Sequence, residues 1–588
     1  MRPTPQRVGR STGARLGGRD RDGLVLAAGA GFLGLSWLIW VGGGLLTLVT
    51  TGRWREVPVG NAPALLVRLM AHPFMPREAW PPLIRRSLPG TGLTLAWLTG
   101  LVVAAVVSSA AIWWSAVRPR RARARSSPGA RGWAHARDLR RLRVRSPTGD
   151  RIVLGTNAGH LLAAEPRHSV MVVGPTQSGK TTALAIPAIL EWEGPLLATS
   201  VKADLLRETL EWRRSIGQVQ CYDPTGSTGA GGSSAPPSPG AFAGAVGGTA
   251  GWSPLARAVT WPGARRIASS LCSVARAGDG GMEDAGFWYA NAEKLLAPLL
   301  FAAATAGASM ADVVRWLDEE ETAEVLLALE LAGVPEAVRA ARASLGREER
   351  QRASVYATAE TVVAAFADPA VAASAERCDI DPAALVASHA GSLFCCAPAR
   401  EQERLAPVFT AIVREVLDAA FERAAATGRP LDPPLLVVLD EAASVAPLAD
   451  LDRVVATAAG HGVQLVTVWQ DLAQVESRYG TRWATVVNNH RAKIVCSGIA
   501  DPVTLQHVSG LLGDEERADR SWTVGDDGRH SRTEAVSVQA LAPAGWLRQL
   551  PPGEAVLVYG SLPPAQIALR PWFDDPGLTV RAGGGSAR

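Results

Sequence analysis

With 588 residues the chain is too long for a single hydrophobic core, so at least two folded domains are expected. Its 47% hydrophobic share allows for globular cores with membrane segments added. The net charge of +5 hides an asymmetry, because residues 1–150 carry about +17 and the remainder about −12. This distribution favours a chain anchored on anionic lipid over one coated in DNA. The six cysteines show no metal-binding spacing and are typical of reduced, buried thiols.

Two long uncharged stretches lie near the N-terminus, at residues 24–49 and 88–117. Each exceeds the roughly 20 residues that a helix needs to cross a bilayer. Arginine-rich segments precede the first stretch and follow the second, which predicts both flanks in the cytoplasm and residues 53–87 outside. We therefore predict that residues 1–118 form a membrane anchor with two transmembrane helices. A pair of buried core helices is the alternative, and a cleaved signal peptide is disfavoured by the length of the first stretch.

The most specific motif in the chain is G-x-x-x-x-G-K-T, which follows the apolar run 170–173 and opens a predicted helix. Strand, glycine loop and helix together indicate a phosphate-binding loop, whose backbone N–H groups form an anion cradle. Lys180 is expected to reach the terminal phosphates, and the Thr181 hydroxyl is expected to coordinate Mg2+. The predicted ligand is therefore ATP with Mg2+. The predicted nucleotide-binding residues are Gly174, Pro175, Thr176, Gln177, Ser178, Gly179, Lys180, Thr181 and Thr182.

Strand signals at 195–200 and 219–222 follow this loop, and their alternation with helices predicts a parallel sheet covered on both faces. Residues 225–250 consist largely of Gly, Ser, Ala and Pro and are predicted to be a disordered surface loop. The chain then becomes rich in Ala and Leu with helical spacing, which predicts an inserted all-helical domain before the strand pattern resumes. The predicted order is a basic linker at 119–149, a first segment of the nucleotide-binding domain at 150–255, the helical domain at 256–388, a second segment of the nucleotide-binding domain at 389–578 and a disordered tail at 579–588.

A second acidic motif ends the apolar strand 435–439. Asp440 is predicted to hold Mg2+, and Glu441 is predicted to act as the base that polarises the attacking water. An acidic turn at a strand end is the ordinary alternative, but the phosphate-binding loop makes the catalytic interpretation stronger. Gln470 closes the next apolar strand and is a candidate sensor of the terminal phosphate if that strand adjoins the acidic one. Residues 522–538 predict a hairpin.

Three segments together resemble the type IV secretion coupling proteins, the TraG/TraD-type ATPases of conjugative DNA transfer. They are GPTQSGKTTALAIPAILEWEGPLL, PLLVVLDEAASVAPLADLDRVVATAAGHGVQLVTVWQDLAQV and NNHRAKIVCSGIADPVTLQHVSGLLG. The resemblance extends from the membrane segments to about residue 575. It implies a RecA-like, hexameric ATPase that spans the inner membrane more than once and keeps its ATPase body in the cytoplasm.

The same resemblance implies the partners. Proteins of this family bring a relaxase–DNA complex to a secretion channel and drive single-stranded DNA through it, so relaxosome proteins and channel components are expected partners. The segment after Asp440 resembles the region that contacts relaxosome accessory proteins.

Two positions depart from the family pattern. Ala459 stands where the family usually has an arginine that serves a neighbouring subunit's ATP, which leaves Arg453 and Arg491 as candidates for that role. Ser200-Val201 replaces the more common Asp-Pro, which leaves the role of Lys202 open. Two alternative functions therefore stay in view. One is an FtsK-type pump for double-stranded DNA, and the other is a docking platform for secreted proteins that hydrolyses little ATP.

Overall fold

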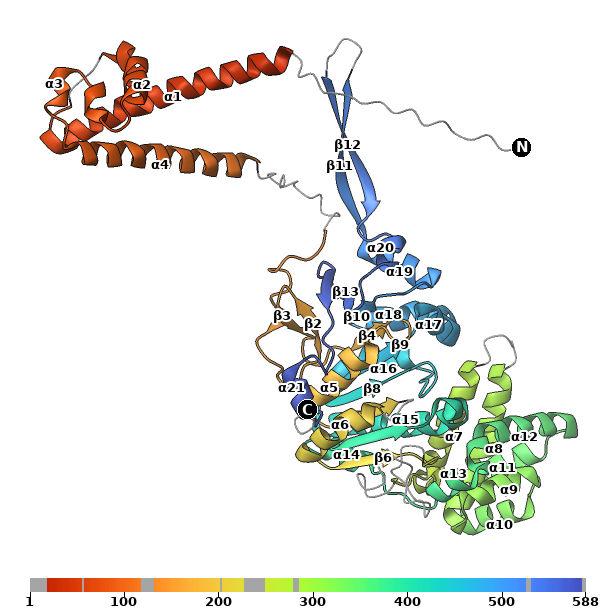
Figure 1. Cartoon of the computed structure of the whole chain (residues 1–588). Coiled ribbons are helices and arrows are strands. Elements are labelled where there is room, and N and C mark those ends of the chain that lie inside the picture. The colour runs from red at the N-terminus through yellow and green to blue at the C-terminus, as the bar shows by residue number, and fades with distance from the viewer. Residues whose placement is uncertain are drawn as a thin grey trace, which may run out of the picture. The chain divides into compact units, whose positions relative to one another are not determined.

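The computed structural model describes residues 18–54, 58–117, 132–200, 204–226, 249–278, 285–524 and 530–583. It divides the chain into two compact units, residues 1–126 and 127–588, which are treated separately below (Figure 1). Lys202 and most of the loop predicted at 225–250 lie outside the described residues.

The N-terminal unit is built on two long helices, α1 (Gly18–Thr51) and α4 (Thr91–Val117), which contact each other. The indole nitrogen of Trp97 on α4 donates a hydrogen bond to the carbonyl of Gly42 on α1 over 3.1 Å. Trp80, only 3% exposed, packs against Gly43, where an added Cβ would lie 1.8 Å from the indole ring. The chain between the long helices forms η1 (Val59–Asn61), α2 (Ala62–Ala71), η2 (Pro76–Ala79) and α3 (Pro82–Arg85).

One described segment of this unit, Phe32–Thr51 in α1, has the length and hydropathy of a membrane span. The apolar run that the described residues of α4 offer, Thr91–Ala105, is shorter. At 1.5 Å per residue such a run covers about 22 Å of the roughly 30 Å hydrocarbon core. Among the described residues there is thus one apolar N-terminal helix of spanning length, where the sequence predicted two.

The larger unit contains a 12-stranded sheet among its described residues. Seven of its strands, from the middle of the sheet to one edge, run parallel in the order β10-β4-β9-β8-β5-β7-β6. They are β4 (Val170–Val173), β5 (Leu196–Ser200), β6 (Val219–Tyr222), β7 (Ser392–Cys396), β8 (Leu435–Leu439), β9 (Val463–Trp469) and β10 (Ala492–Cys496).

Antiparallel strands extend this sheet beyond β10 in the order β13-β14-β2-β3-β1. They are β1 (Arg143–Val144), β2 (Val153–Asn157), β3 (His160–Ala163), β13 (Glu554–Tyr559) and β14 (Ala565–Ala568). The sheet is therefore mixed, not purely parallel as predicted. The connections between β2 and β3 and between β13 and β14 are too short for a crossover, and such short links join antiparallel strands.

Helices cover both faces of the sheet because successive side chains of each strand point to opposite sides. On β5, Leu196 and Ala198 join one core cluster and Leu197 joins the other. The face that carries Leu196 and Ala198 packs against α5 (Ile186–Glu191) and α6 (Asp204–Ile216). The opposite face, which carries Leu197, packs against α15 (Gln402–Thr427) and α16 (Leu451–His461). Further along the chain are α17 (Leu472–Tyr479), η7 (Gly480–Arg482), α18 (Trp483–Asn489), α19 (Pro502–Leu512) and α20 (Ala544–Arg548).

Between β6 and β7 the described residues form helices and turns without a strand. Their bounds are η4 (Pro254–Arg257), α7 (Trp261–Gly278), α8 (Ala285–Ala306), α9 (Met310–Asp318), α10 (Ala323–Ala332), α11 (Pro335–Leu345), α12 (Glu349–Val363), η5 (Ala364–Ala367), α13 (Pro369–Ser374) and α14 (Pro382–Ala387). Another 3-10 turn, η6 (Ala399–Glu401), follows β7. The helices gather beside one end of the sheet (Figure 1). A separate hairpin pairs β11 (Asp514–Val524) with β12 (His530–Ala540), and its predicted turn at 525–529 lies outside the described residues.

Two segment boundaries predicted from composition are wrong. Leu139 and Leu142, placed in the basic linker, are buried in the core, and β1 after them pairs with β3. The arginine content masked the few apolar residues, which bury while their charged neighbours stay at the surface. At the C-terminal end, α21 (Pro576–Arg581) runs three residues into the predicted tail, and Leu578 on it is buried.

Candidate functional site

The loop after β4 is shaped for close approach by a ligand. At Gly174 an added Cβ would lie 2.6 Å from Ser178 Oγ and 2.7 Å from Cys496 Cβ, so only glycine fits there. Gln177 and Gly179 have φ values of +65° and +87°. Left-handed backbone at these positions forms a concave turn, the geometry in which successive N–H groups converge on an anion.

Lys180 holds its ammonium group over this loop. Its Nζ donates hydrogen bonds to the carbonyls of Gly174 and Pro175, over 2.5 and 2.6 Å. Burial lowers the pKa of Lys180, while the nearby carboxylates of Asp440 and Glu441 act in the opposite direction. A compact cation is thus held at the concave side of the loop, where anionic oxygens are favoured.

The helix after the loop starts with a π-turn, η3 (Thr181–Ala185), before α5 begins. The N–H of Ile186 bonds to the carbonyl of Thr181, one residue further back than in an α-helix. Pro187 follows and has no N–H to offer the next carbonyl in that pattern. The Thr182 carbonyl instead accepts the N–H of Trp572, 3.0 Å away.

Asp440 meets the start of this helix from a nearby strand of the sheet. It follows the last residue of β8, is 6% exposed, and has its two carboxylate oxygens 3.3 and 3.5 Å from Thr181 Oγ1. Glu441 has a φ of +55°, which is uncommon for a residue other than glycine. A hydrogen bond from Ala442 N to the carbonyl of Val468 on β9 holds the turn in place over 3.1 Å.

Gln470 lies at the same edge of the sheet. Strand β9 pairs in parallel with both β4 and β8, and Val173 lies opposite Trp469, so the residue after Trp469 is level with the start of the phosphate loop. The N–H of Gln470 donates to Gln474 Oε1 over 3.1 Å. The prediction for Gln470 required its strand to adjoin the strand that ends in Asp440. Strands β9 and β8 are indeed neighbours.

Cys496 is a residue at this site that sequence reasoning missed. It ends β10, which pairs with β4, and its Cβ lies directly behind Gly174. Burial raises the pKa of its thiol to about 12, so the thiol is neutral. The resembling segment around it was noted, but no local pattern shows that β10 and β4 are neighbours.

Ala459, which replaces the family's arginine, and Arg491, one of the two candidates to take its role, both lie away from the loop. Ala459 is near the C-terminal end of α16, which leads into the first residue of β9, and Arg491 immediately precedes β10. Both thus lie at the strand starts, the edge opposite the phosphate loop. Arg453 is exposed in the first turn of α16.

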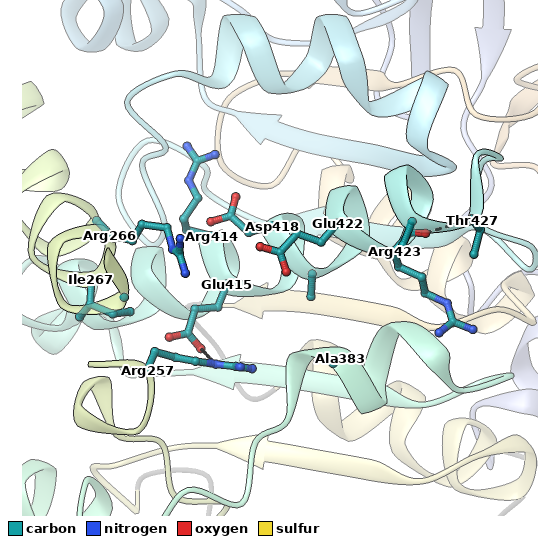
Figure 2. Close-up of a pocket in the computed structure, with 14 residues that line it drawn as sticks. Arg257, Arg266, Ile267, Ala383, Arg414, Glu415, Asp418, Glu422, Arg423 and Thr427 are labelled. Atoms are coloured by element: carbon teal, nitrogen blue, oxygen red, sulfur yellow. Dashed lines mark hydrogen bonds and ion pairs between the residues drawn. The ribbon is translucent and has the colours of Figure 1, made fainter. Parts of the chain in front are cut away.

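A cavity of about 470 Å3 lies elsewhere, between α15, the start of α7 and α14 (Figure 2). Three of its charged lining residues, Arg257, Arg414 and Glu415, pair within the chain. Glu415 accepts a hydrogen bond from Trp252 Nε1 over 3.2 Å and lies 3.9 Å from Arg257, while Arg414 pairs with Asp450. Burial raises the pKa of Glu415 to about 7. None of the residues predicted to bind nucleotide or metal is among the described residues that line this cavity.

A phosphate-type loop after one central strand, with an acidic pair after a nearby strand of the same sheet, defines the α/β class of P-loop proteins. The family model described as "Type IV secretory system Conjugative DNA transfer" matches residues 133–230 and 264–586, well over half of the chain. The chain belongs to this family, as the resemblance predicted.

Individual relatives agree with this assignment. Two conjugal transfer proteins TraG of Escherichia coli are each 25% identical to the chain, over 374 and 470 residues. These matches cover 59% and 72% of this chain, and 55% and 70% of the relatives' own lengths.

Solved structures of the bacterial conjugative coupling protein TrwB have the same fold. The unbound form is 20% identical and has a TM-score of 0.58, with 76% of this chain and 93% of that chain covered. The form in complex with ADP and Mg2+ is also 20% identical, has a TM-score of 0.55 and covers 76% and 94%. The likeness to these structures confirms the expected RecA-like α/β fold.

Proposed function

We propose that this chain is a membrane-anchored ATPase that recruits a relaxase–DNA complex and drives single-stranded DNA into a conjugative secretion channel. Family membership supports the transfer role, and the site supports the energy source. The observation that supports ATP as the energy source is the contact between Thr181 and Asp440. These residues are 259 positions apart in the sequence, and Thr181 Oγ1 lies 3.3 Å from a carboxylate oxygen of Asp440. One hydroxyl and one carboxylate at a phosphate loop are the groups that a Mg2+-dependent nucleotide site needs.

The residues present fit ATP and Mg2+. The loop 174–182 offers backbone N–H groups and Lys180 to the phosphates, and the oxygens of Thr181 and Asp440 are the hard ligands that Mg2+ prefers. When bound, the ion neutralises charge on the terminal phosphates. The TrwB structure in complex with ADP and Mg2+, which has the same fold, supports this pair of ligands.

Glu441 and Gln470 act on the water in this proposal. Glu441 follows the buried Asp440 on a strained turn that fixes its direction, and it takes the proton of the attacking water. Gln470, level with the loop on the adjacent strand, orients that water or senses the terminal phosphate.

The rest of the chain assembles around this site. The apolar segment Phe32–Thr51 of α1, which has the length and hydropathy of a membrane span, supports the membrane anchor. The helices between β6 and β7 form the inserted domain at 256–388, and six copies close a ring in which a subunit completes its neighbour's site. Because Ala459 provides no guanidinium, another arginine serves in trans, with exposed Arg453 the candidate.

The test is steady-state ATP hydrolysis by the full chain in lipid nanodiscs, without DNA, with single-stranded DNA and with duplex DNA. Stimulation by single strands that is lost in Glu441→Gln is the expected result. Preferential stimulation by duplex DNA would replace the proposal with an FtsK-type pump.

A second candidate function, a docking platform for secreted proteins, is favoured specifically by Ala459. It predicts tight ATP binding without turnover, with or without DNA, in chains verified as hexamers. Transfer by a cell whose only copy carries Lys180→Ala would exclude any role for ATP at this site.

A further inference from the structure

The chain between α1 and α4 packs against the side of the apolar segment of α1. Helix α2 contacts α1 (Figure 1), and its buried Leu65 and Leu66 face the interior of the N-terminal unit. They share a core cluster with Ile39 and Leu46 of α1. Both α1 residues lie within Phe32–Thr51, the segment with the length and hydropathy of a membrane span. Helix α2 therefore lies beside this segment and not beyond its end.

Three indole rings meet α1 at three successive glycines, residues 42–44. Trp97 Nε1 donates a hydrogen bond to the carbonyl of the first glycine over 3.1 Å. A Cβ on the second would lie 1.8 Å from the Trp80 ring, and a Cβ on the third would lie 2.6 Å from the Trp54 ring. Tryptophan rings are enriched where the headgroups of a bilayer meet its acyl chains. The rings therefore indicate that this boundary crosses α1 at the level of α2, whose α1 partners lie on either side of the glycines.

The exposed side of α2 and the turn that follows it are apolar. Val67 and Met70 on α2 are 56% and 69% exposed, and Phe74 and Met75 after it are 83% and 56% exposed. We call these four side chains the apolar surface. Single exposed apolar residues are ordinary on a protein in water, but a group of four within nine positions marks an interaction site. Because the buried side of α2 packs on α1, the exposed side points away from α1, into the layer around the apolar segment.

Arginines flank the apolar surface in the chain. Residues 53–87 contain six arginines and two glutamates, a net charge of +4. Arg68 on α2 is exposed, and Arg77 and Arg85 donate hydrogen bonds to each other's backbone carbonyl over 3.1 and 3.3 Å. The exposed Glu78 forms no ion pair with any arginine that the structure describes in this segment. The positive charge there is thus open to anionic groups outside the chain.

We propose that residues 62–77 lie in the boundary layer of the bilayer, with the apolar surface among the acyl chains and the flanking arginines at the headgroups of anionic phospholipids. The inference rests on the membrane anchoring in the proposed function. Segments that lie in a membrane interface combine an apolar side with basic residues, and each arginine near an anionic surface adds attraction. The segment is then part of the anchor, whereas the sequence predicted a loop outside the membrane.

The test places a fluorescent label at single cysteines of the full chain in nanodiscs and measures quenching by lipids that carry a spin label at a known depth. Cys378, the exposed native cysteine, is first replaced by serine. Labels at Phe74→Cys and Met70→Cys are expected to lie about 5–10 Å below the headgroup boundary. Leu33→Cys reports the apolar segment of α1 itself. Leu331→Cys, which labels an 80% exposed apolar residue of α10, is the matched control and should not be quenched.

The lipid composition tests the arginines. Quenching of the label at Phe74→Cys should be stronger in nanodiscs of phosphatidylcholine with phosphatidylglycerol than in phosphatidylcholine alone. Replacing the exposed Arg68 and Arg86 by glutamine should abolish this difference. Equal quenching of the unsubstituted arginine chain in both lipid mixtures would overturn the recognition of anionic headgroups.

The positions separate this inference from the anchoring on which it rests. Quenching at Leu33→Cys without quenching at Phe74→Cys would overturn the inference and leave the anchor intact. A label at Phe74→Cys that lipid does not quench, but that is shielded from a quencher in water, would assign the apolar surface to another protein or a second copy, which also overturns the inference. Absence of quenching at both positions would overturn the membrane anchor of the proposed function as well.

Discussion

The phosphate edge of the sheet and the cavity beside α15 both bring charged side chains under partial burial, yet they differ in how those charges are held. At the phosphate edge, Lys180 bonds only to backbone carbonyls of its own loop, and Glu441 sits on a left-handed backbone. At the cavity, Glu415 and Arg414 have partners within the chain. Among the described residues, Lys180 thus has no acidic hydrogen-bond partner, whereas Glu415 and Arg414 at the cavity each have an oppositely charged side chain within ion-pair distance.

This difference shows that open volume is a poor guide to chemistry in this protein. The cavity offers about 470 Å3 but lacks the phosphate-loop residues, while the phosphate loop is a shallow cradle of backbone. Phosphate recognition relies on converging N–H groups and a cation, which require close backbone approach more than an enclosed space.

The largest expected effect comes from removing the cation at the phosphate edge, with removal of a cation at the cavity as the control. Lys180→Ala should lower ATP turnover by at least about 100-fold, because a preorganised charge at the transferring phosphate is lost. Arg266→Ala, which removes a cation lining the cavity, should leave turnover within a factor of two (an order-of-magnitude expectation). Steady-state hydrolysis by each full-length variant measures both, and an equal loss in Arg266→Ala would break the comparison.

The next largest effect on ATP turnover should come from exchanging the acid Glu441 for its amide, with the same exchange at Glu415 in the cavity as the control. Glu441→Gln removes the proposed base and should slow turnover by about 100- to 10,000-fold with ATP binding retained. Glu415→Gln keeps a hydrogen-bond acceptor for Trp252 and should hydrolyse ATP at the wild-type rate. Calorimetry and hydrolysis on the same preparations check the two, and loss of ATP binding in Glu441→Gln would assign that residue a structural role.

A smaller effect is expected at the second strand of the phosphate edge. Gln470→Ala should lower turnover by about 5- to 10-fold, the loss of one hydrogen bond to the attacking water or terminal phosphate. Its neighbour Gln474, which accepts the N–H of Gln470, provides a control. If Gln474→Ala lowers turnover as much, the effect belongs to the turn and not to the Gln470 side chain.

The smallest effect should appear as a pH-dependent stability of the cavity region. Burial raises the pKa of Glu415 to about 7 from its ordinary value of 4.5, so the folded state holds a proton that the unfolded state releases. This contribution is fully present below about pH 4.5 and is lost as pH rises through about 7.

Glu415→Gln should therefore melt at a higher temperature than the wild type at pH 8, by about 2–6 °C, and equal it near pH 5. Thermal unfolding of both full-length proteins across this range measures the difference. A gap of the same size at both pH values would mean that charge at Glu415 does not cause it.

The sequence alone determined the motifs whose residues are contiguous, and from these motifs the site was predicted. The loop 174–182, the acidic pair at 440–441 and the family resemblance all depend on short runs in which strand, turn and helix residues follow one another. The capping box at Ser309 and Asp312 is a local pattern of the same kind, with both of its hydrogen bonds present. Such patterns can be recognised in the sequence because the residues that interact lie within a few positions of one another.

Only the tertiary structure decided what depends on distant neighbours. Composition assigned Leu139 to a linker and Arg581 to a tail, but burial and contacts with α5 and α6 place both in the folded body. The insertion of β9 between β4 and β8, the position of Cys496 behind Gly174 and the bond from Trp572 to Thr182 likewise have no local signal. Strand order and long-range hydrogen bonds follow from which apolar faces can be buried together and which backbone groups then remain to be paired, and these are properties of the whole chain.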